Sequence, residues 1–306
     1  MIFSVQILGS NSALAAHGRH PTAQIVRHDK SVFLVDCGEG TQMRMSAFKI
    51  KRSKIRHIFI SHLHGDHYFG LIGLLTSYHL MKRTDPLTIH GPAALQEIIV
   101  TQLNASSTVL SYDLIFQPTQ MEKKEVIFEN DHLKVYSFPL LHRIATTGFL
   151  FEEKLGTRRI NTDKIDQLHL ERAQYKALKQ GKSIEIDGTK YANEKLTLPP
   201  HTPRSYAFCT DTRFLPELKD YIEDVDLLYH EATFTKEAVV RAEETFHSTT
   251  EQAAEIAKVT NSKELLIGHF SSKYMDLSEV LAEAKAIFPN TQLAIEGEIF
   301  DIPRTN

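Results

Sequence analysis

The sequence has few cysteines, no long apolar run and no marked excess of charge of either sign. Its 306 residues include only two cysteines, Cys37 and Cys209, which cannot build a disulfide framework, so we expect a protein of the reducing cytoplasm. No apolar run approaches the length of about 18 residues that a membrane-spanning helix needs. Residues 1–9 alternate like a strand and lack the charged segment of a signal peptide. We therefore expect a cytoplasmic protein that does not associate with membranes.

The overall charge gives no argument for nucleic-acid binding, because 35 Lys and Arg stand against 38 Asp and Glu, a net charge of −3. The distribution is less even than the sum. Residues 151–204 hold eleven Lys and Arg against eight Asp and Glu, a local charge of +3. A second basic run, residues 49–56, ends shortly before the histidine-rich residues 61–67. It is either a solvated loop or, if it lies beside those residues in space, a surface that attracts phosphate.

Hydrophobic periodicity predicts strands alternating with helices around one core. The predicted strands are residues 2–9, 23–28, 31–36, 57–61, 87–89, 133–138, 147–151, 205–209, 226–229 and 264–267. The predicted helices are residues 68–81, 92–103, 248–259 and 277–287. Because the alternation is not a strict βαβ repeat, we expect sheets in the middle with helices outside, as a single domain over residues 1–306.

Residues 152–204 interrupt this rhythm between two predicted core strands. The segment is charged, has a helix-like piece over residues 163–180 and ends in a proline-rich stretch. Fifty residues are more than a connection requires. The segment is therefore either an inserted functional arm or a plain surface excursion.

Residues 61–67, with the sequence SHLHGDH, are the strongest functional signal in the chain. Side chains two apart in an extended segment point to the same side, so His62, His64 and Asp66 can converge, with His67 added where the chain turns. Imidazole nitrogens and carboxylate oxygens are the ligands that zinc and similar ions prefer. Four such donors exceed what one ion takes from one loop, and the spacing predicts two neighbouring ions.

Three further candidate ligands follow predicted strands. They are His142, Asp211 and His269, each of which taken alone could be an ordinary surface residue. Loops at one edge of a sheet sandwich converge, so together with residues 61–67 they form two ligand sets that share Asp211. The sets are His62, His64 and His142 for one ion, and Asp66, His67 and His269 for the other. Asp36 either orients a metal-bound histidine or is a turn residue before Gly38.

Several separate motifs resemble the ribonuclease Z family of the metallo-β-lactamase superfamily. The matching segments are residues 36–42 (DCGEGTQ), 60–67 (ISHLHGDH), 230–233 (HEAT), 247–249 (HST) and 268–274 (GHFSSKY). The resemblance implies an α/β fold, a four-layer αββα sandwich with an inserted protruding arm. It also implies two Zn²⁺ ions per subunit on the seven ligands above, with Mn²⁺ also suited to them.

The activity implied by the resemblance is removal of the 3′ trailer from precursor tRNA. Hydroxide activated by the two metal ions would attack phosphorus, leaving a 3′-hydroxyl on the tRNA and a 5′-phosphate on the trailer. The family pattern implies that Asp66 accepts the proton of the attacking water, that His247 donates a proton to the departing 3′-oxygen, and that Glu231 orients His247. No Gly-x-Ser-x-Gly nucleophile elbow is present.

The inserted segment, about residues 152–204, occupies the position of the arm with which the family grips tRNA. The resemblance implies a homodimer in which the arm of one subunit presents tRNA to the active site of the other. Lys273 stands where the family commonly has arginine, and it could also contact RNA. The candidate RNA contacts in the arm are Lys154, Arg158, Arg159, Lys176, Lys179, Lys182 and Lys190.

Two alternatives remain open at the level of sequence. One is a hydrolase of small phosphodiesters or esters on the same fold, and the other is a non-catalytic RNA-binding relative. The arm and the His247 motif favour the endoribonuclease over the first alternative. The presence of all seven ligands favours it over the second.

Overall fold

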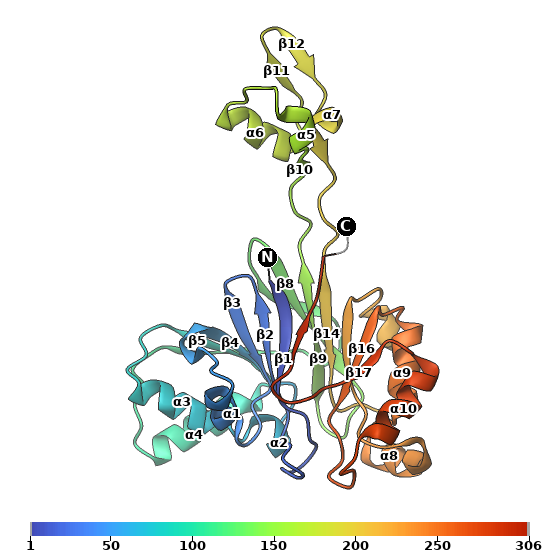
Figure 1. Ribbon diagram of the computed structural model, residues 1–306. Coiled ribbons are helices and arrows are strands. Elements are labelled where there is room, and N and C mark those ends of the chain that lie inside the picture. The colour runs from blue at the N-terminus through green and yellow to red at the C-terminus, as the bar shows by residue number, and fades with distance from the viewer. Residues whose placement is uncertain (1, 305–306) are drawn as a thin grey trace.

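The computed structural model describes residues 2–304, in which two seven-stranded sheets pack face to face with helices on both outer sides (Figure 1). The first sheet has the order β18 (Ile299–Asp301), β1 (Phe3–Gly9), β2 (Ala23–His28), β3 (Ser31–Val35), β4 (Ile55–Phe59), β5 (Leu87–Gly91) and β6 (Leu114–Pro118). The second has the order β17 (Thr291–Leu293), β16 (Glu264–Gly268), β15 (Leu227–Glu231), β14 (Ser205–Cys209), β9 (Thr146–Glu153), β8 (Leu133–Leu140) and β7 (Glu125–Glu129).

Helices cover the outer face of each sheet. The first sheet carries α1 (Thr41–Ala47), α2 (Gly65–Tyr68), α3 (Leu71–Leu80) and α4 (Ala94–Ala105), and the second carries α8 (Val239–Thr245), α9 (Thr250–Val259) and α10 (Ser278–Ile287). Short 3₁₀ turns are η1 (Arg52–Lys54), η2 (Pro216–Asp220) and η3 (Lys236–Ala238). Among residues 2–304, no helix combines the length and the apolar character needed to cross a membrane.

The side chains of one strand serve two cores, because successive residues point to opposite faces of a sheet. On β3, Phe33 and Val35 pack between the two sheets, whereas Leu34 packs under the outer helices. A third core lies between the second sheet and α9 and α10. Burial of both faces explains why these strands read as continuous apolar runs. The predicted αββα sandwich is confirmed.

Strand direction brings five loops to one end of the sandwich. Strands β14, β15 and β16 run parallel, and β8 shares their direction because β9 is antiparallel to both β8 and β14. Their carboxyl ends therefore lie at one edge of the second sheet. The carboxyl end of β4 in the first sheet lies at the same end of the sandwich, next to α2 (Figure 1).

Residues 154–204, which we call the arm, protrude from the opposite end of the sandwich (Figure 1). The arm joins the end of β9 to the start of β14, and this edge is the far one from the five loops. It contains β10 (Arg159–Ile160), α5 (Thr162–Ile165), α6 (Arg172–Lys179), β11 (Ile184–Ile186), β12 (Thr189–Tyr191), α7 (Asn193–Leu196) and β13 (Thr197–Leu198). Its small separate core buries Ile165, Leu178, Ile184 and Leu196.

The helix predicted over residues 68–81 is confirmed as α3, and the short helix α2 precedes it and ends at Tyr68. Gly70 lies between the two, where a Cβ would be 2.2 Å from the Gly38 carbonyl oxygen. Two other local expectations were wrong. The helix-like piece at residues 163–180 is two helices, α5 and α6. The basic run at residues 49–56 lies at the amino end of β4, so the five-residue strand, about 15 Å long, separates it from the loop at residues 61–67.

Candidate metal-binding active site

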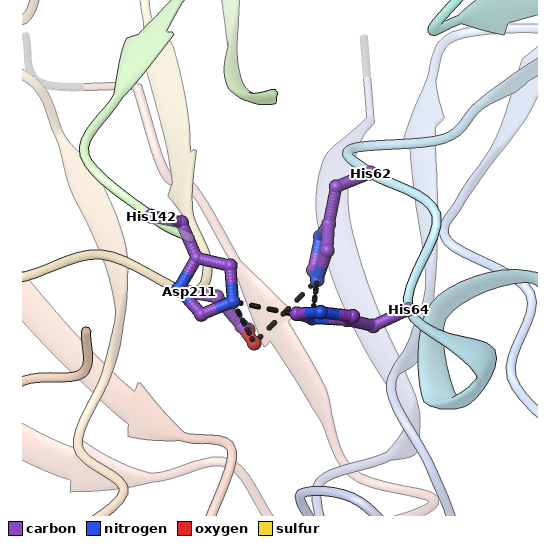
Figure 2. Close-up of side chains that lie close together, drawn as sticks. All are labelled: His62, His64, His142 and Asp211. Carbon is purple, nitrogen blue, oxygen red and sulfur yellow. Dashed lines mark hydrogen bonds and ion pairs between the residues drawn. The ribbon is translucent and has the colours of Figure 1, made fainter. Parts of the chain in front are cut away.

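Four side chains from three loops form the first ligand group (Figure 2). His62 and His64 follow β4, His142 follows β8 and Asp211 follows β14, and Figure 2 shows their donor atoms pointing into one space. His64 Nδ1 lies 3.1 Å from His62 Nε2 and 3.2 Å from His142 Nε2. Asp211 Oδ2 lies 3.6 Å from His62 Nε2 and 3.7 Å from His142 Nε2.

The second ligand group lies on the other side of Asp211. Asp211 Oδ1 is 3.3 Å from His67 Nε2 and 3.2 Å from His269 Nε2. Asp66 Oδ2 is 3.5 Å from both of these nitrogens. Because the two oxygens of Asp211 face different groups, this carboxylate is placed to bridge two ions. The structure thus brings together all seven ligands proposed from the sequence.

The donor set fits a pair of metal ions. Two donors that bind one zinc tetrahedrally at about 2.0–2.1 Å are about 3.3 Å apart, close to the separations within both groups. The Nε2 atoms of His67 and His269 are buried and have no hydrogen-bond partner in the described part of the chain. Buried ring nitrogens that face carboxylate oxygens in this way need a positive charge beside them, which a metal ion or, without one, a proton supplies.

In His62, His67, His142 and His269 the other ring nitrogen, Nδ1, is held by a protein oxygen, which fixes the ring and leaves Nε2 as the metal ligand. His142 Nδ1 donates to the Phe246 carbonyl oxygen at 2.8 Å. His269 Nδ1 lies 2.9 Å from Thr233 Oγ1, whose hydroxyl in turn donates to a carboxylate. His64 is the exception, since it offers Nδ1 to the group.

Asp36 lies behind both groups and orients two of their histidines. Its Oδ2 accepts from His67 Nδ1 at 2.7 Å and from Ser61 Oγ at 2.9 Å, while its Oδ1 accepts from the Ser61 amide at 2.8 Å. Ser61 Oγ is 3.0 Å from His62 Nδ1, so the contact chain reaches the other ligand group. Asp36 is fully buried and adopts a φ of 53°, a conformation that Asp tolerates better than most residues.

His247 and Glu231 form a pair beside the ligand groups. His247 Nδ1 is 2.8 Å from Glu231 Oε1 and 4.0 Å from Asp211 Oδ2. Glu231 is fully buried, and the amides of Thr212 and Thr233 donate to its two oxygens at 3.1 and 3.0 Å. The position of Glu231 thus agrees with the expectation that it orients His247.

Electrostatics show that the site is built to hold positive charge. Burial lowers the pKa of His62 and His64 and lowers that of His142 to about 4, so these rings are neutral and able to bind a metal. Burial opposes a charge on His67, yet the surrounding carboxylates raise its pKa well above the ordinary value, with Asp211 contributing most. Without an ion, a proton on His67 therefore balances part of the negative charge that a metal would neutralise.

An open cleft of about 460 Å³ gives access to both groups. His64, Asp66, Asp211, His247 and His269 line it. Residues that the sequence did not single out also contribute, because the amide of Ala13 donates to Asp66 Oδ2 at 2.7 Å, and Phe69 and Arg143 line the wall. No sequence signal marks Ala13, whereas Arg143 directly follows a proposed ligand and could have been considered.

The candidate RNA contacts of the arm lie at the other end of the sandwich from this cleft, and Lys176, Lys179, Lys182 and Lys190 are exposed there. Lys273 is exposed in the loop after His269, at the same end as the cleft. Others have structural partners: Lys154 pairs with Glu129 at 2.7 Å, and Arg158 and Arg159 donate to Thr197 Oγ1 and the Pro199 carbonyl oxygen. The two arginines therefore help to close the base of the arm.

Comparison with solved structures shows the same fold. The short form of human tRNase Z covers 98% of this chain and 99% of its own, with a TM-score of 0.72 and 24% identity. The metallo-β-lactamase fold protein YhfI from Bacillus subtilis covers 98% of this chain and 100% of its own, with a TM-score of 0.69 and 16% identity.

Sequence comparison gives the family. The family model described as the anti-Pycsar protein Apyc1 matches residues 3–180, which include the loop at residues 61–67 and His142 but not the later motifs. Ribonuclease Z of Phocaeicola vulgatus is 45% identical over 295 residues, 96% of each chain. Ribonuclease Z of Porphyromonas gingivalis is 40% identical over 301 residues, 98% of this chain and 99% of the relative. The chain therefore falls in the family that the Apyc1 model describes and belongs to the ribonuclease Z family.

Proposed function

We propose that this protein is a metal-dependent endoribonuclease that removes the 3′ trailer from precursor tRNA. The products are a tRNA with a 3′-hydroxyl and a trailer with a 5′-phosphate. One observation carries the proposal: six ligands in two groups share a seventh, Asp211, which lines an open cleft, and the His247–Glu231 pair lies beside them. Family membership supplies the substrate class, since the relatives named above are ribonucleases Z.

The proposed cofactor is a pair of Zn²⁺ ions, for which Mn²⁺ can substitute. His62, His64 and His142 would hold one ion, and Asp66, His67 and His269 the other, with Asp211 shared. Such a pair supplies Lewis-acid stabilisation of charge on a phosphate and lowers the pKa of a nucleophilic water.

The side chains of the cleft divide the proton transfers between them. Asp66, anchored by the Ala13 amide, would accept a proton from the attacking water. His247 donates through Nδ1 to Glu231, so its Nε2 is the atom that can carry a proton into the cleft and release it to the departing 3′-oxygen. Burial opposes a charge on His247, but the Glu231 carboxylate raises its pKa to about 9 in the metal-free chain, in keeping with a protonated ring.

The arm is proposed as the tRNA-binding exosite, and the working unit as a homodimer. The arm leaves the sandwich at the end opposite the cleft, so an RNA held on the arm of one subunit would reach the cleft of its partner more readily than that of its own subunit (Figure 1). The exposed lysines of the arm, together with Lys154, Arg158, Arg159 and, outside the arm, Lys273, are the proposed phosphate contacts. The buried free thiols of Cys37 and Cys209 support a cytoplasmic location.

Parallel assays with two substrates test the proposal. Metal-loaded protein is incubated with a precursor tRNA carrying a 3′ trailer and with bis-p-nitrophenyl phosphate, and the RNA ends are mapped. We expect a single cut that leaves a 3′-hydroxyl and a 5′-phosphate, and no cut by the Asp66→Asn protein. Hydrolysis of the small ester without cleavage of the precursor would instead assign the protein to the hydrolases of small phosphodiesters.

A further inference from the structure

A second cleft, of about 400 Å³, lies at the base of the arm, at the other end of the sandwich from the metal ligands. We call it the arm-base cleft and define it by His132, Glu153, Lys154, His201 and Arg304, which line it. His132 comes from the turn before β8 and Arg304 from the end of the described chain, while Glu153 and Lys154 lie where the chain enters the arm and His201 where it leaves the arm. Four separate parts of the chain thus converge here.

The carboxylate in this cleft already has its partners. Glu153 accepts hydrogen bonds from His28 Nε2 at 3.0 Å, from the Arg204 guanidinium at 2.8 Å and from Arg304 at 3.3 Å. Its side chain and that of Arg204 are each only 5% exposed. Glu153 therefore anchors the arm to the sandwich, and the guanidinium groups of Arg204 and Arg304 balance its negative charge.

The remaining charge of the cleft is positive. His201 Nε2 lies 3.5 Å from a guanidinium nitrogen of Arg159, and because arginine only donates, this nitrogen accepts and leaves His201 Nδ1–H as a donor. Desolvation lowers the pKa of His201, and the guanidinium groups of Arg159 and Arg304 lower it further, against an opposing effect of Glu153.

A count of charges gives the same result. The charged side chains that line the cleft or are paired with its lining comprise four cations, Lys154, Arg159, Arg204 and Arg304, and two carboxylates, Glu129 and Glu153. The excess of two positive charges and the converging N–H donors are what an oxyanion requires.

We propose that the arm-base cleft binds a phosphate group of the RNA backbone. The inference rests on the proposed function for the identity of the RNA. Apart from the two imidazoles, no aromatic side chain lines the cleft among the described residues, so it is suited to a phosphate rather than to a stacked base. Its place on the stem of the arm means that it positions the body of the RNA and does not touch the reacting atoms.

Binding of a labelled tRNA without a trailer tests this site independently of cleavage. Fluorescence anisotropy is measured from 50 to 300 mM salt for the parent and for the His201→Ala/Arg304→Gln protein. We expect Kd to rise about 3- to 10-fold. The slope of the logarithm of the association constant against log[salt] should decrease in magnitude by about 1, as for one lost phosphate contact. A second variant, His132→Ala/Lys154→Gln, leaves the Arg304–Glu153 contact in place and is expected to act in the same direction.

Two controls make the result specific. Arg304→Lys keeps the cation and should bind nearly as the parent does, whereas Lys285→Gln removes an exposed cation from α10 and should change neither Kd nor the slope. Parental Kd and slope in both double variants would overturn the proposal. It would equally be overturned if inorganic phosphate shifted the His201 ring signals of the parent protein in NMR while both double variants bound tRNA as the parent does. The cleft would then bind free phosphate and not the RNA backbone.

Discussion

The active-site cleft, which the metal ligands line, and the arm hold their functional side chains in opposite ways. At the cleft, His62, His67 and Asp211 are at most 2% exposed, and the carboxylates, hydroxyls and carbonyls around them fix each ring. The arm buries a few aliphatic side chains in a core of its own and leaves its lysines in solvent. The positions of the metal-binding side chains therefore depend on packing throughout the sandwich, whereas the proposed RNA binding depends on the arm, which has a core of its own.

The largest effect is expected from Asp211→Ala, which removes the carboxylate whose two oxygens face the two different ligand groups. Each group loses a donor, and the loss of several kcal/mol of charge stabilisation corresponds to about 10³-fold or more in rate. Cleavage of precursor tRNA measures the rate, and mass spectrometry of the native protein measures bound metal. Two ions bound by the variant, with activity near that of the parent, would refute the bridging role.

Excision of the arm separates the two regions. Ile160 and Thr197 are paired residues of β10 and β13, so a short glycine–serine turn can replace residues 161–196 without opening the stem. We expect cleavage of precursor tRNA to fall by about 10²-fold or more, because binding energy remote from the reacting bond is lost. Hydrolysis of bis-p-nitrophenyl phosphate should remain within a factor of two, and an equal loss of both activities would show that the arm supports the cleft itself.

Asp36→Asn tests how far metal binding in the active-site cleft depends on residues that hold the ligands without themselves binding the metal. Asparagine keeps the size and tolerates the positive φ, but it removes the charge that accepts from His67 Nδ1. We expect metal affinity to fall by about 10- to 100-fold, as measured by competition with a chelating dye. Asp29→Asn is the matched control, since Asp29 has a φ of 50° in an exposed turn, and it should bind metal as the parent does.

The smallest effect concerns two histidines that have no carboxylate partner among residues 2–304. His57 Nδ1 and His90 Nε2 are 3.2 Å apart, and burial lowers the pKa of His57 to about 4 and of His90 to about 3. Below the ordinary pKa of about 6.5 the unfolded chain takes up protons that the folded chain does not. The free energy of unfolding should therefore fall as the pH drops from 6.5 to 4.

Replacing His90 should remove part of this pH dependence. Between pH 7.0 and 4.5, His90→Phe should lose about 2 kcal/mol less stability than the parent in urea unfolding. His169→Ala, on the exposed surface of the arm, should lose as much as the parent. A His90→Phe protein with the parental pH dependence would show that this ring does not titrate as a buried group.

The sequence predicted most of the site because the residue types of the ligands and their places after strands are local signals. Residues 61–67 with His142, Asp211 and His269 come together as expected. Thr233 could not be predicted as a support for His269, because its contact depends on two loops that meet only in the fold. The basic run at residues 49–56 was misplaced because closeness in sequence was read as closeness in space across a strand.

The arm was the harder region to predict, since it is short of periodic apolar residues. One signal was available and overlooked: Asp187-Gly188, with φ values of 48° and 76°, joins β11 to β12, and this dipeptide is typical of a tight hairpin. The split of residues 163–180 into α5 and α6 depends on packing against the small arm core. Short helices of this kind are set by tertiary contacts rather than by propensity.

Mixing two inactive proteins tests most directly whether the cleft of one subunit works with the arm of its partner. One has residues 161–196 replaced by the turn, and the other carries Asp211→Ala. In a mixed dimer the first subunit supplies an intact cleft and the second an intact arm. Cleavage of precursor tRNA should return once subunits exchange, well above that of either protein alone. Mixed dimers that form, as shown by native mass spectrometry, and yet cleave no precursor would contradict the account.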